Sequence, residues 1–245
     1  MKLREQGVPI KIVSLGHRDG TALMVGKDSD ILTIADLKGK TIAVPNRYSN
    51  QYLILFKALK GVGLTIKDVN IVEMPPPDMP SALYSKAVDA ITSGEPFMGQ
   101  TELEGYGRVL FQAKEISPNF IPCVLVVRDD MIKSHPEWVQ QLVDGIARSG
   151  KWLDAGMDHR MAAAENISKD YYNQKPELLR FVLSKPPDRV TYSDLSLARK
   201  DFEIIEGLAR EAGIINSPLT FDQYADPTFT ARSADARGYD WSGKP

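Results

Sequence analysis

Apolar and polar residues alternate in short blocks through the first half of the chain. Apolar runs of strand length occupy Ile10–Leu15, Thr21–Gly26, Thr41–Pro45, Val69–Met74, Val88–Thr92 and Arg108–Ala113. From residue 49 to residue 60 the apolar positions recur at helical spacing, and Ser49 or Asn50 supplies an N-cap. The prolines at 75–77 block strand pairing and predict a helix from about Asp78. Strands that alternate with helices in this way predict an α/β fold with a largely parallel sheet.

The second half of the chain is mostly helical. It follows a predicted strand at Ile121–Val127, and the change of pattern near Pro122 indicates that the chain enters a different structural context there. The apolar spacing then predicts helices at Pro136–Met157, Arg160–Tyr172, Pro176–Leu183 and Ser193–Ala212.

Two segments near the amino end have local signals of their own. Gly16–Gly20 has turn chemistry, so we expect it to join the strands on either side as a turn. Met1–Gly7 resembles the last turns of a helix that Gly7 ends, and a helix end without a start predicts a first structural unit truncated at its N-terminus. The first residues carry no pattern of a secretory signal peptide.

Composition excludes several classes of protein. The 30 basic and 32 acidic side chains nearly balance and form no basic stripe, which argues against nucleic-acid binding. No apolar run approaches the roughly 18 residues that span a bilayer. Cys123 is the only cysteine, so an intrachain disulfide is excluded, and its apolar strand predicts a buried thiol. The histidines are scattered, so we expect no metal site and no cofactor.

Several short motifs resemble those of the extracytoplasmic solute-binding proteins of ABC importers, in the branch that handles nitrate, sulfonates, taurine and thiamine-pyrimidine precursors. The motifs are Asp36-Leu37-Lys38-Gly39-Lys40, Ser49-Asn50-Gln51, Gly63-Leu64 with Asp68-Val69, Val88-Asp89-Ala90, and Glu95-Pro96. The resemblance implies a type II periplasmic-binding-protein fold, with two α/β lobes around a ligand cleft and a first lobe that is N-terminally truncated. It implies lobe one for residues 1–36, lobe two for 37–121, and a return to lobe one with the C-terminal helices and tail for 122–245.

The same resemblance implies a function. Such a chain captures a small polar solute of the sulfonate, nitrate or pyrimidine-precursor class between two closing lobes. It then delivers the solute to an ABC permease and its ATPase subunit, from the periplasm or another extracytoplasmic space. This role needs no catalytic residue and no cofactor. The alternative is a cofactor-independent enzyme on the same fold, either a small-acid dehydratase or a thiamine-pyrimidine synthase, although the latter carries a cysteine-rich motif that this chain lacks.

The resemblance places a ligand loop at Asn46–Tyr52. Ser49, Asn50 and Gln51 lie where free backbone N–H groups collect at a helix start, which suits an anionic or carbonyl group. The alternative for these residues is N-capping with no ligand. Tyr48 and Tyr52 are candidates for an aromatic wall, and Tyr52 at helical spacing suits core packing equally well. Family members often have Gly-Ser here and a histidine three residues later, where this chain has Tyr48-Ser49 and Tyr52.

Two further pairs are candidates for the cleft. Glu95 and Phe97 follow the end of a strand, so Glu95 either selects a ligand with a donor group or lies in the first turn of a helix, where its charge is favoured. Phe97 is a candidate for the aromatic wall. His17 and Arg18 either face the cleft from lobe one, with Arg18 binding an acid group, or belong to a solvated turn.

Overall fold

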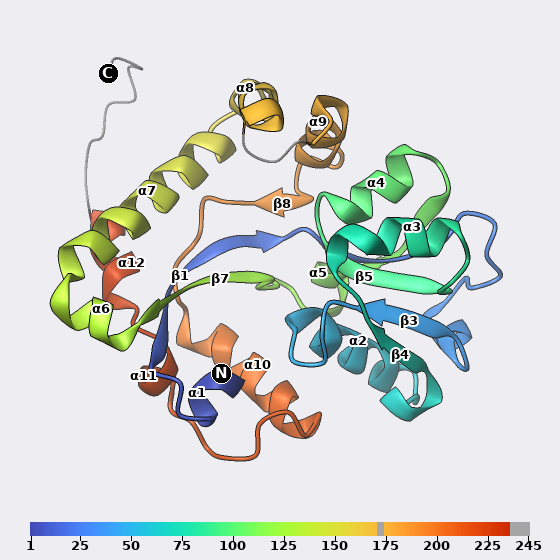
Figure 1. Ribbon diagram of the computed structural model, residues 1–245, viewed down its shortest axis with the longest axis horizontal. Helices are drawn as coiled ribbons and strands as arrows, with labels where there is room; N and C mark the ends of the chain where they lie inside the picture. The colour runs from blue at the N-terminus through green and yellow to red at the C-terminus, as the bar shows by residue number, and fades with distance from the viewer. Residues whose placement is uncertain (171–173, 236–245) are drawn as a thin grey trace.

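The computed structural model describes residues 1–170 and 174–235 and contains two separate sheets (Figure 1). The three-stranded sheet has the order β7-β1-β8 and consists of β1 (Ile10–Asp19), β7 (Cys123–Arg128) and β8 (Val190–Thr191). The five-stranded sheet has the order β4-β3-β5-β2-β6 and consists of β2 (Thr21–Gly26), β3 (Thr41–Val44), β4 (Asn70–Glu73), β5 (Ala90–Gly94) and β6 (Gly107–Gln112). Each sheet is the centre of one lobe.

Helices cover both faces of each sheet. In the five-stranded lobe they are α2 (Asn50–Gly61), α3 (Met79–Tyr84), α4 (Phe97–Leu103) and α5 (Ala113–Ile116). In the three-stranded lobe they are α1 (Lys2–Glu5), α6 (Asp129–Ser134), α7 (Pro136–Asp154), α10 (Arg199–Glu211), α11 (Phe221–Tyr224) and α12 (Thr228–Asp235). Helices α8 (Met157–Asp170) and α9 (Pro176–Ser184) lie above the junction of the lobes in Figure 1. Short 3-10 helices occupy Ile34–Leu37, Ile66–Asp68 and Pro76–Asp78.

The core of the five-stranded lobe follows from strand alternation. Leu23 and Ala90 point to the face covered by α2, where Leu55 and Leu59 pack against them. The residues next to them along β2 and β5 point to the other face and pack against α3 and α4. The predicted helix from residue 49 to 60 and the predicted helix after the prolines are both confirmed.

The chain crosses between the lobes at Gly20. β1 continues unbroken to Asp19, Gly20 has a φ of 71°, and β2 starts at Thr21 in the other sheet. The predicted turn at Gly16–Gly20 is therefore wrong, because these residues extend one strand instead of folding two strands into a hairpin. Within residues 1–36, β1 belongs to the three-stranded sheet, whereas β2 pairs with β5 and β6 in the five-stranded sheet.

The five-stranded sheet is mixed, in contrast to the largely parallel sheet that was predicted. β3 runs parallel to β4 and β5, whereas β2 is antiparallel to β5 and β6. The reason is that β2 enters directly from the other lobe and not through a crossover helix. After residue 121 the chain continues into β7, which pairs with β1 in the three-stranded sheet.

Two other expectations are corrected. The helix predicted from Ser193 starts only at Arg199, and Cys123 is exposed, not buried. Cys123 begins β7, which lies at the edge of its sheet, so the apolar sequence around it does not bury it. Within the described part of the chain, no helix combines the length and the apolar character needed to cross a membrane.

Candidate functional site

The first turn of α2 lies at the carboxyl end of β3, on the side of the five-stranded sheet that faces the crossing. Ser49 is the N-cap: its hydroxyl accepts a hydrogen bond from the Tyr52 N–H at 3.2 Å and donates to the Asn46 carbonyl at 2.7 Å. The capping that the sequence predicted is therefore present, and it uses both functions of the Ser49 hydroxyl.

The Ser49 cap satisfies the Tyr52 N–H but not the two backbone N–H groups that precede it in α2. The N–H groups of Asn50 and Gln51 find no acceptor among the residues that the structure describes. Free N–H groups at the start of a 12-residue helix attract anions, because the helix dipole adds partial positive charge there.

A polar pair from the sheet lies under this turn. Thr21 and Thr92 point to the same face as Leu23, which is the face that α2 covers, and the Gln51 amide nitrogen donates to the Thr21 hydroxyl at 3.4 Å. Thr92 is 0% exposed, and its hydroxyl has no hydrogen-bond partner. We call Asn50, Gln51, Thr21 and Thr92 the α2 entrance.

The crossing strand adds more unpartnered polar atoms. His17 Nδ1 and Asp19 Oδ1 are buried without a hydrogen-bond partner, and Asp19 is separated from Thr21 only by Gly20. Burial lowers the pKa of the His17 imidazole and raises the pKa of the Asp19 carboxyl. The Tyr192 ring lies 6.0 Å from the His17 ring, and burial raises the pKa of Tyr192 to about 12.

Arg18 does not lie in a solvated turn, because only 6% of it is exposed. Its guanidinium donates to the Asp194 and Asn119 carbonyls at 2.9 and 3.1 Å and to the Asp201 carboxylate at 3.1 Å. It also reaches the Ser196 carbonyl at 3.3 Å. Because the Asp194 and Ser196 carbonyls bind Arg18, they are not free to accept helical N–H groups, which explains why α10 starts later than predicted. These hydrogen bonds engage four of the five N–H donors of the Arg18 guanidinium within the protein.

Glu95 is likewise engaged by the protein. One carboxylate oxygen accepts from the Gly99 N–H at 2.7 Å, in the first turn of α4, and the other binds Arg189 at 2.7 Å. This arrangement favours the helix-start alternative for Glu95 over direct contact with a ligand. It adds an ion pair that no local pattern predicted.

The remaining candidates divide between the surface and the core. Tyr48 is 63% exposed and, with Asn50, lines a hollow of about 120 Å³ next to α10. The Asn50 side chain donates to the Ile121 carbonyl at 2.6 Å. Tyr52 packs in the core under α2, and Phe97 packs against the core on the opposite face, so core packing accounts for both rings.

Thr21, Thr92, Asp19 and Tyr192 were missed by sequence reasoning. Thr21 and Thr92 begin and end ordinary apolar strands, and nothing local marks their hydroxyls as unpartnered. Tyr192 follows β8, which is only two residues long and too short to predict from its pattern. The one usable signal was the placement of Thr92 near the carboxyl end of a strand, where α/β sheets bind ligands.

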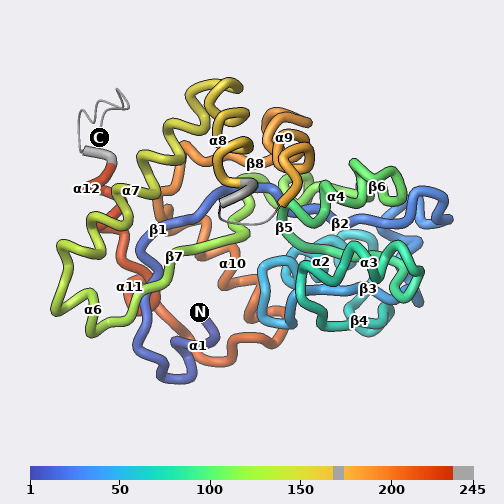
Figure 2. Tube along the Cα trace, turned by 45° about the horizontal axis from the view of Figure 1, so that its top comes forward, coloured from blue at the N-terminus to red at the C-terminus, as the bar shows by residue number. Residues whose placement is uncertain are grey.

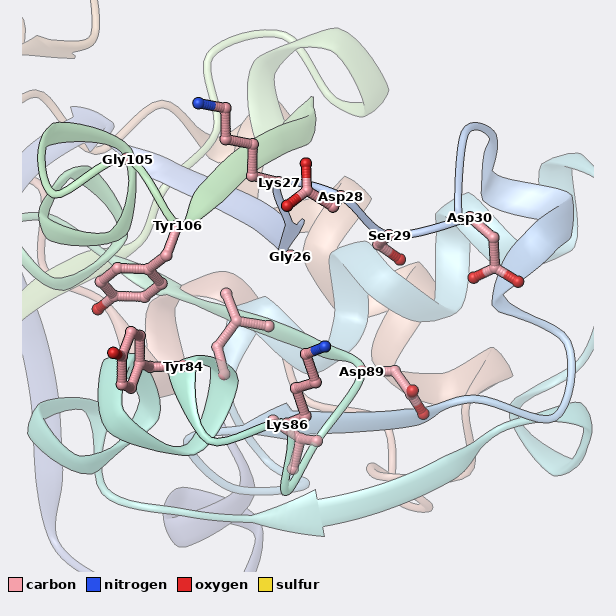
Figure 3. A pocket seen from close by; sticks show the side chains of 12 residues that line it. Gly26, Lys27, Asp28, Ser29, Asp30, Tyr84, Lys86, Asp89, Gly105 and Tyr106 are labelled. Atoms are coloured by element: carbon pink, nitrogen blue, oxygen red, sulfur yellow. The ribbon is translucent and has the colours of Figure 1, made fainter.

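A hollow of about 570 Å³ lies at the opposite end of the five-stranded sheet (Figure 3). Tyr84 and Tyr106 lie side by side there, with ring centroids 5.1 Å apart. Two of its carboxylates are already engaged, Asp30 by Lys40 and Asp89 by the Thr41 N–H. We assign no ligand to this hollow, because it lies at the amino ends of β3 and β5, away from the α2 entrance. In the ranges 1–170 and 174–235, no group of three or more histidine, cysteine or acidic residues is arranged to hold a metal ion.

Comparison with known proteins places this geometry in context. The chain matches the NMT1-like family over residues 3–168. The taurine-binding periplasmic protein of Escherichia coli K12 is 30% identical over 166 residues, which cover 67% of this chain and 51% of that protein. This chain therefore spans about half the length of that relative.

Two solved structures share the fold. The ligand-binding component of an ABC-type import system from Staphylococcus aureus superposes with a TM-score of 0.80 at 24% identity, covering 95% of this chain and 77% of that one. The periplasmic nitrate-binding protein NrtA from Synechocystis PCC 6803 gives a TM-score of 0.80 at 14% identity, covering 94% and 68%. These matches confirm the predicted two-lobed fold of periplasmic binding proteins.

Proposed function

Because the chain belongs to the NMT1-like family, we propose that it is the solute-binding component of an ABC importer. In this role it binds a small solute with an anionic head, such as a sulfonate, and presents it to a permease and its ATPase outside the cytoplasm. The taurine-binding relative supports the sulfonate class.

The observation that carries the proposal is the α2 entrance. The free N–H groups of Asn50 and Gln51 supply donors for an oxyanion, and the unpartnered Thr92 hydroxyl, on the sheet face that α2 covers, supplies another. Arg18 and Arg189 are already engaged by protein acceptors, so recognition would rest on neutral donors and the helix dipole.

Closure of the lobes must supply most of the affinity. Micromolar binding needs about 8 kcal/mol, whereas a helix terminus contributes at most about 2 kcal/mol. The rest would come from hydrogen bonds and apolar contacts that lose water when the lobes close over the solute. His17, Asp19 and Tyr192 are the first-lobe groups placed to take part.

A substitution at the first position of α2 tests the role of the backbone. Asn50→Pro removes the Asn50 N–H, and Asn50→Ala is the matched control, since both lose the side-chain bond to Ile121. Proline is tolerated at the first helical position, and Ser49 has the extended backbone that suits a following proline, with φ −77° and ψ 154°.

Isothermal titration with taurine, longer alkanesulfonates and nitrate measures the outcome. We expect Asn50→Pro to bind at least about tenfold more weakly than Asn50→Ala, which corresponds to about 1.4 kcal/mol. Equal affinity of the two variants would remove the α2 backbone from the site. Incubation of the wild-type protein with the same compounds, followed by NMR, tests the enzyme alternative, because a binding protein returns its ligand unchanged.

A further inference from the structure

Residues 185–190, which we call the strap, run from the end of α9 to the first residue of β8 and lie against the five-stranded lobe. Arg189 in the strap binds Glu95 and Glu102, each at 2.7 Å, through its two terminal nitrogens. Its Nε donates to the Lys185 carbonyl at 2.6 Å. The Arg189 side chain is 1% exposed, so this is a buried contact between the strap and the start and end of α4.

The packing around Arg189 is equally close. Gly99 of α4 lies so near α9 that a Cβ atom there would come within 2.3 Å of a Val182 methyl group. The Arg189 guanidinium lies 5.1 Å from the centre of the Phe181 ring. Figure 2 shows α9 beside α4 from a second direction.

The other attachment of the strap is to the three-stranded lobe. Arg160 of α8 donates to the Pro187 and Val190 carbonyls at 2.9 and 3.0 Å. Val190 then pairs with Asp19 in β1, directly before the crossing. The strap is thus bonded to both lobes and spans the junction in addition to the crossing at Gly20.

From these contacts we infer that the strap is a latch between the lobes and that Arg189 is a positioning residue, which sets how far they close without touching the solute. The inference rests on the proposed function only in assuming that closure accompanies binding. An ion pair suits a reversible contact, because charges that separate regain water, so opening costs less than the Coulomb attraction alone suggests. Water can reach the edge of the contact, since the Glu102 side chain is 35% exposed.

The strap offers its own control. Lys114 of α5 binds the Asp188 carboxylate at 2.6 Å, but the Asp188 side chain is 71% exposed. An exposed pair of this kind contributes little to a conformational equilibrium. It joins the same two parts of the molecule as Arg189 and differs in burial.

The test compares two neutralised variants of the full chain. Glu95→Gln, Glu102→Gln and Arg189→Met together remove every charge of the buried contact, and replacing all partners at once avoids leaving an isolated buried charge. Lys114→Met with Asp188→Asn removes the exposed pair. Small-angle X-ray scattering without ligand measures the radius of gyration, and thermal unfolding checks that each variant is folded.

We expect the triple variant to show a larger radius of gyration than the wild type, with the Lys114 and Asp188 variant unchanged. A folded triple variant with the wild-type radius would overturn the latch. If the triple variant does not fold, Arg189→Lys takes its place: lysine keeps the charge but cannot bind two carboxylates through a planar fork. An unchanged radius in that variant would overturn the latch in the same way.

A second readout separates this inference from the proposed function. If the wild type binds taurine, we expect the triple variant to release it about tenfold faster, because the closed state is less populated. An unchanged release rate would count against the latch. If the wild type binds no taurine, the ligand proposal fails while the scattering result still decides the latch.

Discussion

The strap and the α2 entrance both lie at the junction of the lobes, yet their polar groups are in opposite situations. Arg189 is fully buried and donates to three protein acceptors, one of them in the strap itself. Thr92 is just as buried, and its hydroxyl has no hydrogen-bond partner within the described part of the chain. A buried polar atom without a partner costs about 1–3 kcal/mol, so an atom of this kind is where a ligand can still gain a hydrogen bond. The presence or absence of protein hydrogen-bond partners, more than the residue type, therefore separates the groups that stabilise the structure from those that can bind a ligand.

The largest loss of stability should come from replacing a buried group that is bound by protein acceptors. Arg18→Leu leaves Asp201 with an uncompensated charge and frees three carbonyls, and breaking a buried ion pair in this way costs about 3–5 kcal/mol. Urea unfolding should show this loss. Arg128→Leu is the control, because the Arg128 side chain is 72% exposed and pairs with an exposed Asp130, so its loss should change the urea midpoint little.

The same variant can contradict the comparison. If Arg18→Leu kept the stability of the wild type but lost taurine binding in isothermal titration, Arg18 would belong to the binding groups. The contacts to residues 194–196 would then be incidental.

Arg18 also shows what sequence can and cannot predict. The helix that Ser49 caps, and the helix after the prolines, were predictable because their signals lie within a few residues of each other. The partners of Arg18 lie 101–183 residues away, and the two carboxylate partners of Arg189 lie 87 and 94 residues away. No local pattern reports a contact at that distance, so the sequence could not show that these charged side chains are engaged by protein partners.

The α2 entrance was only half predictable for the same reason. Asn50 and Gln51 follow from the helix cap at Ser49, whereas Thr92 becomes a candidate only once strand pairing puts it on the face that α2 covers. Its importance lies in a missing partner, and a missing partner cannot be read from the residue itself.

Two buried threonines test the comparison further, with an expected effect of intermediate size. Thr92 and Thr101 are both 0% exposed, but the Thr101 hydroxyl donates to the Met98 carbonyl at 2.9 Å. Thr92→Val should keep or raise the free energy of unfolding, because no hydrogen bond is lost, while taurine affinity falls about fivefold, or about 1 kcal/mol. Thr101→Val should cost about 1 kcal/mol of stability and leave affinity unchanged.

Chemical unfolding and calorimetric titration of the two variants are sufficient for this test. The comparison fails if Thr92→Val is destabilised as much as Thr101→Val, since the Thr92 hydroxyl would then have a protein partner after all. It also fails if both variants bind taurine as the wild type does.

The smallest expected effect is a pH dependence at His17. Burial lowers the pKa of its imidazole in the folded protein, so below about pH 6.5 the unfolded chain takes up a proton that the folded chain does not. Stability is then fully present above pH 6.5 and decreases as the pH falls toward the folded-state pKa. Between pH 7 and 5.5 one such group changes the free energy of unfolding by at most about 1 kcal/mol.

Urea unfolding at these two pH values measures the effect. The difference between the two urea midpoints should be smaller for His17→Asn than for the wild type. His135→Asn, which removes an imidazole stacked on Trp138, is the matched substitution. If His17→Asn showed the same change of stability with pH as the wild type, the His17 imidazole would not be held neutral at the crossing. His17 would then no longer count among the buried polar groups that a ligand can satisfy.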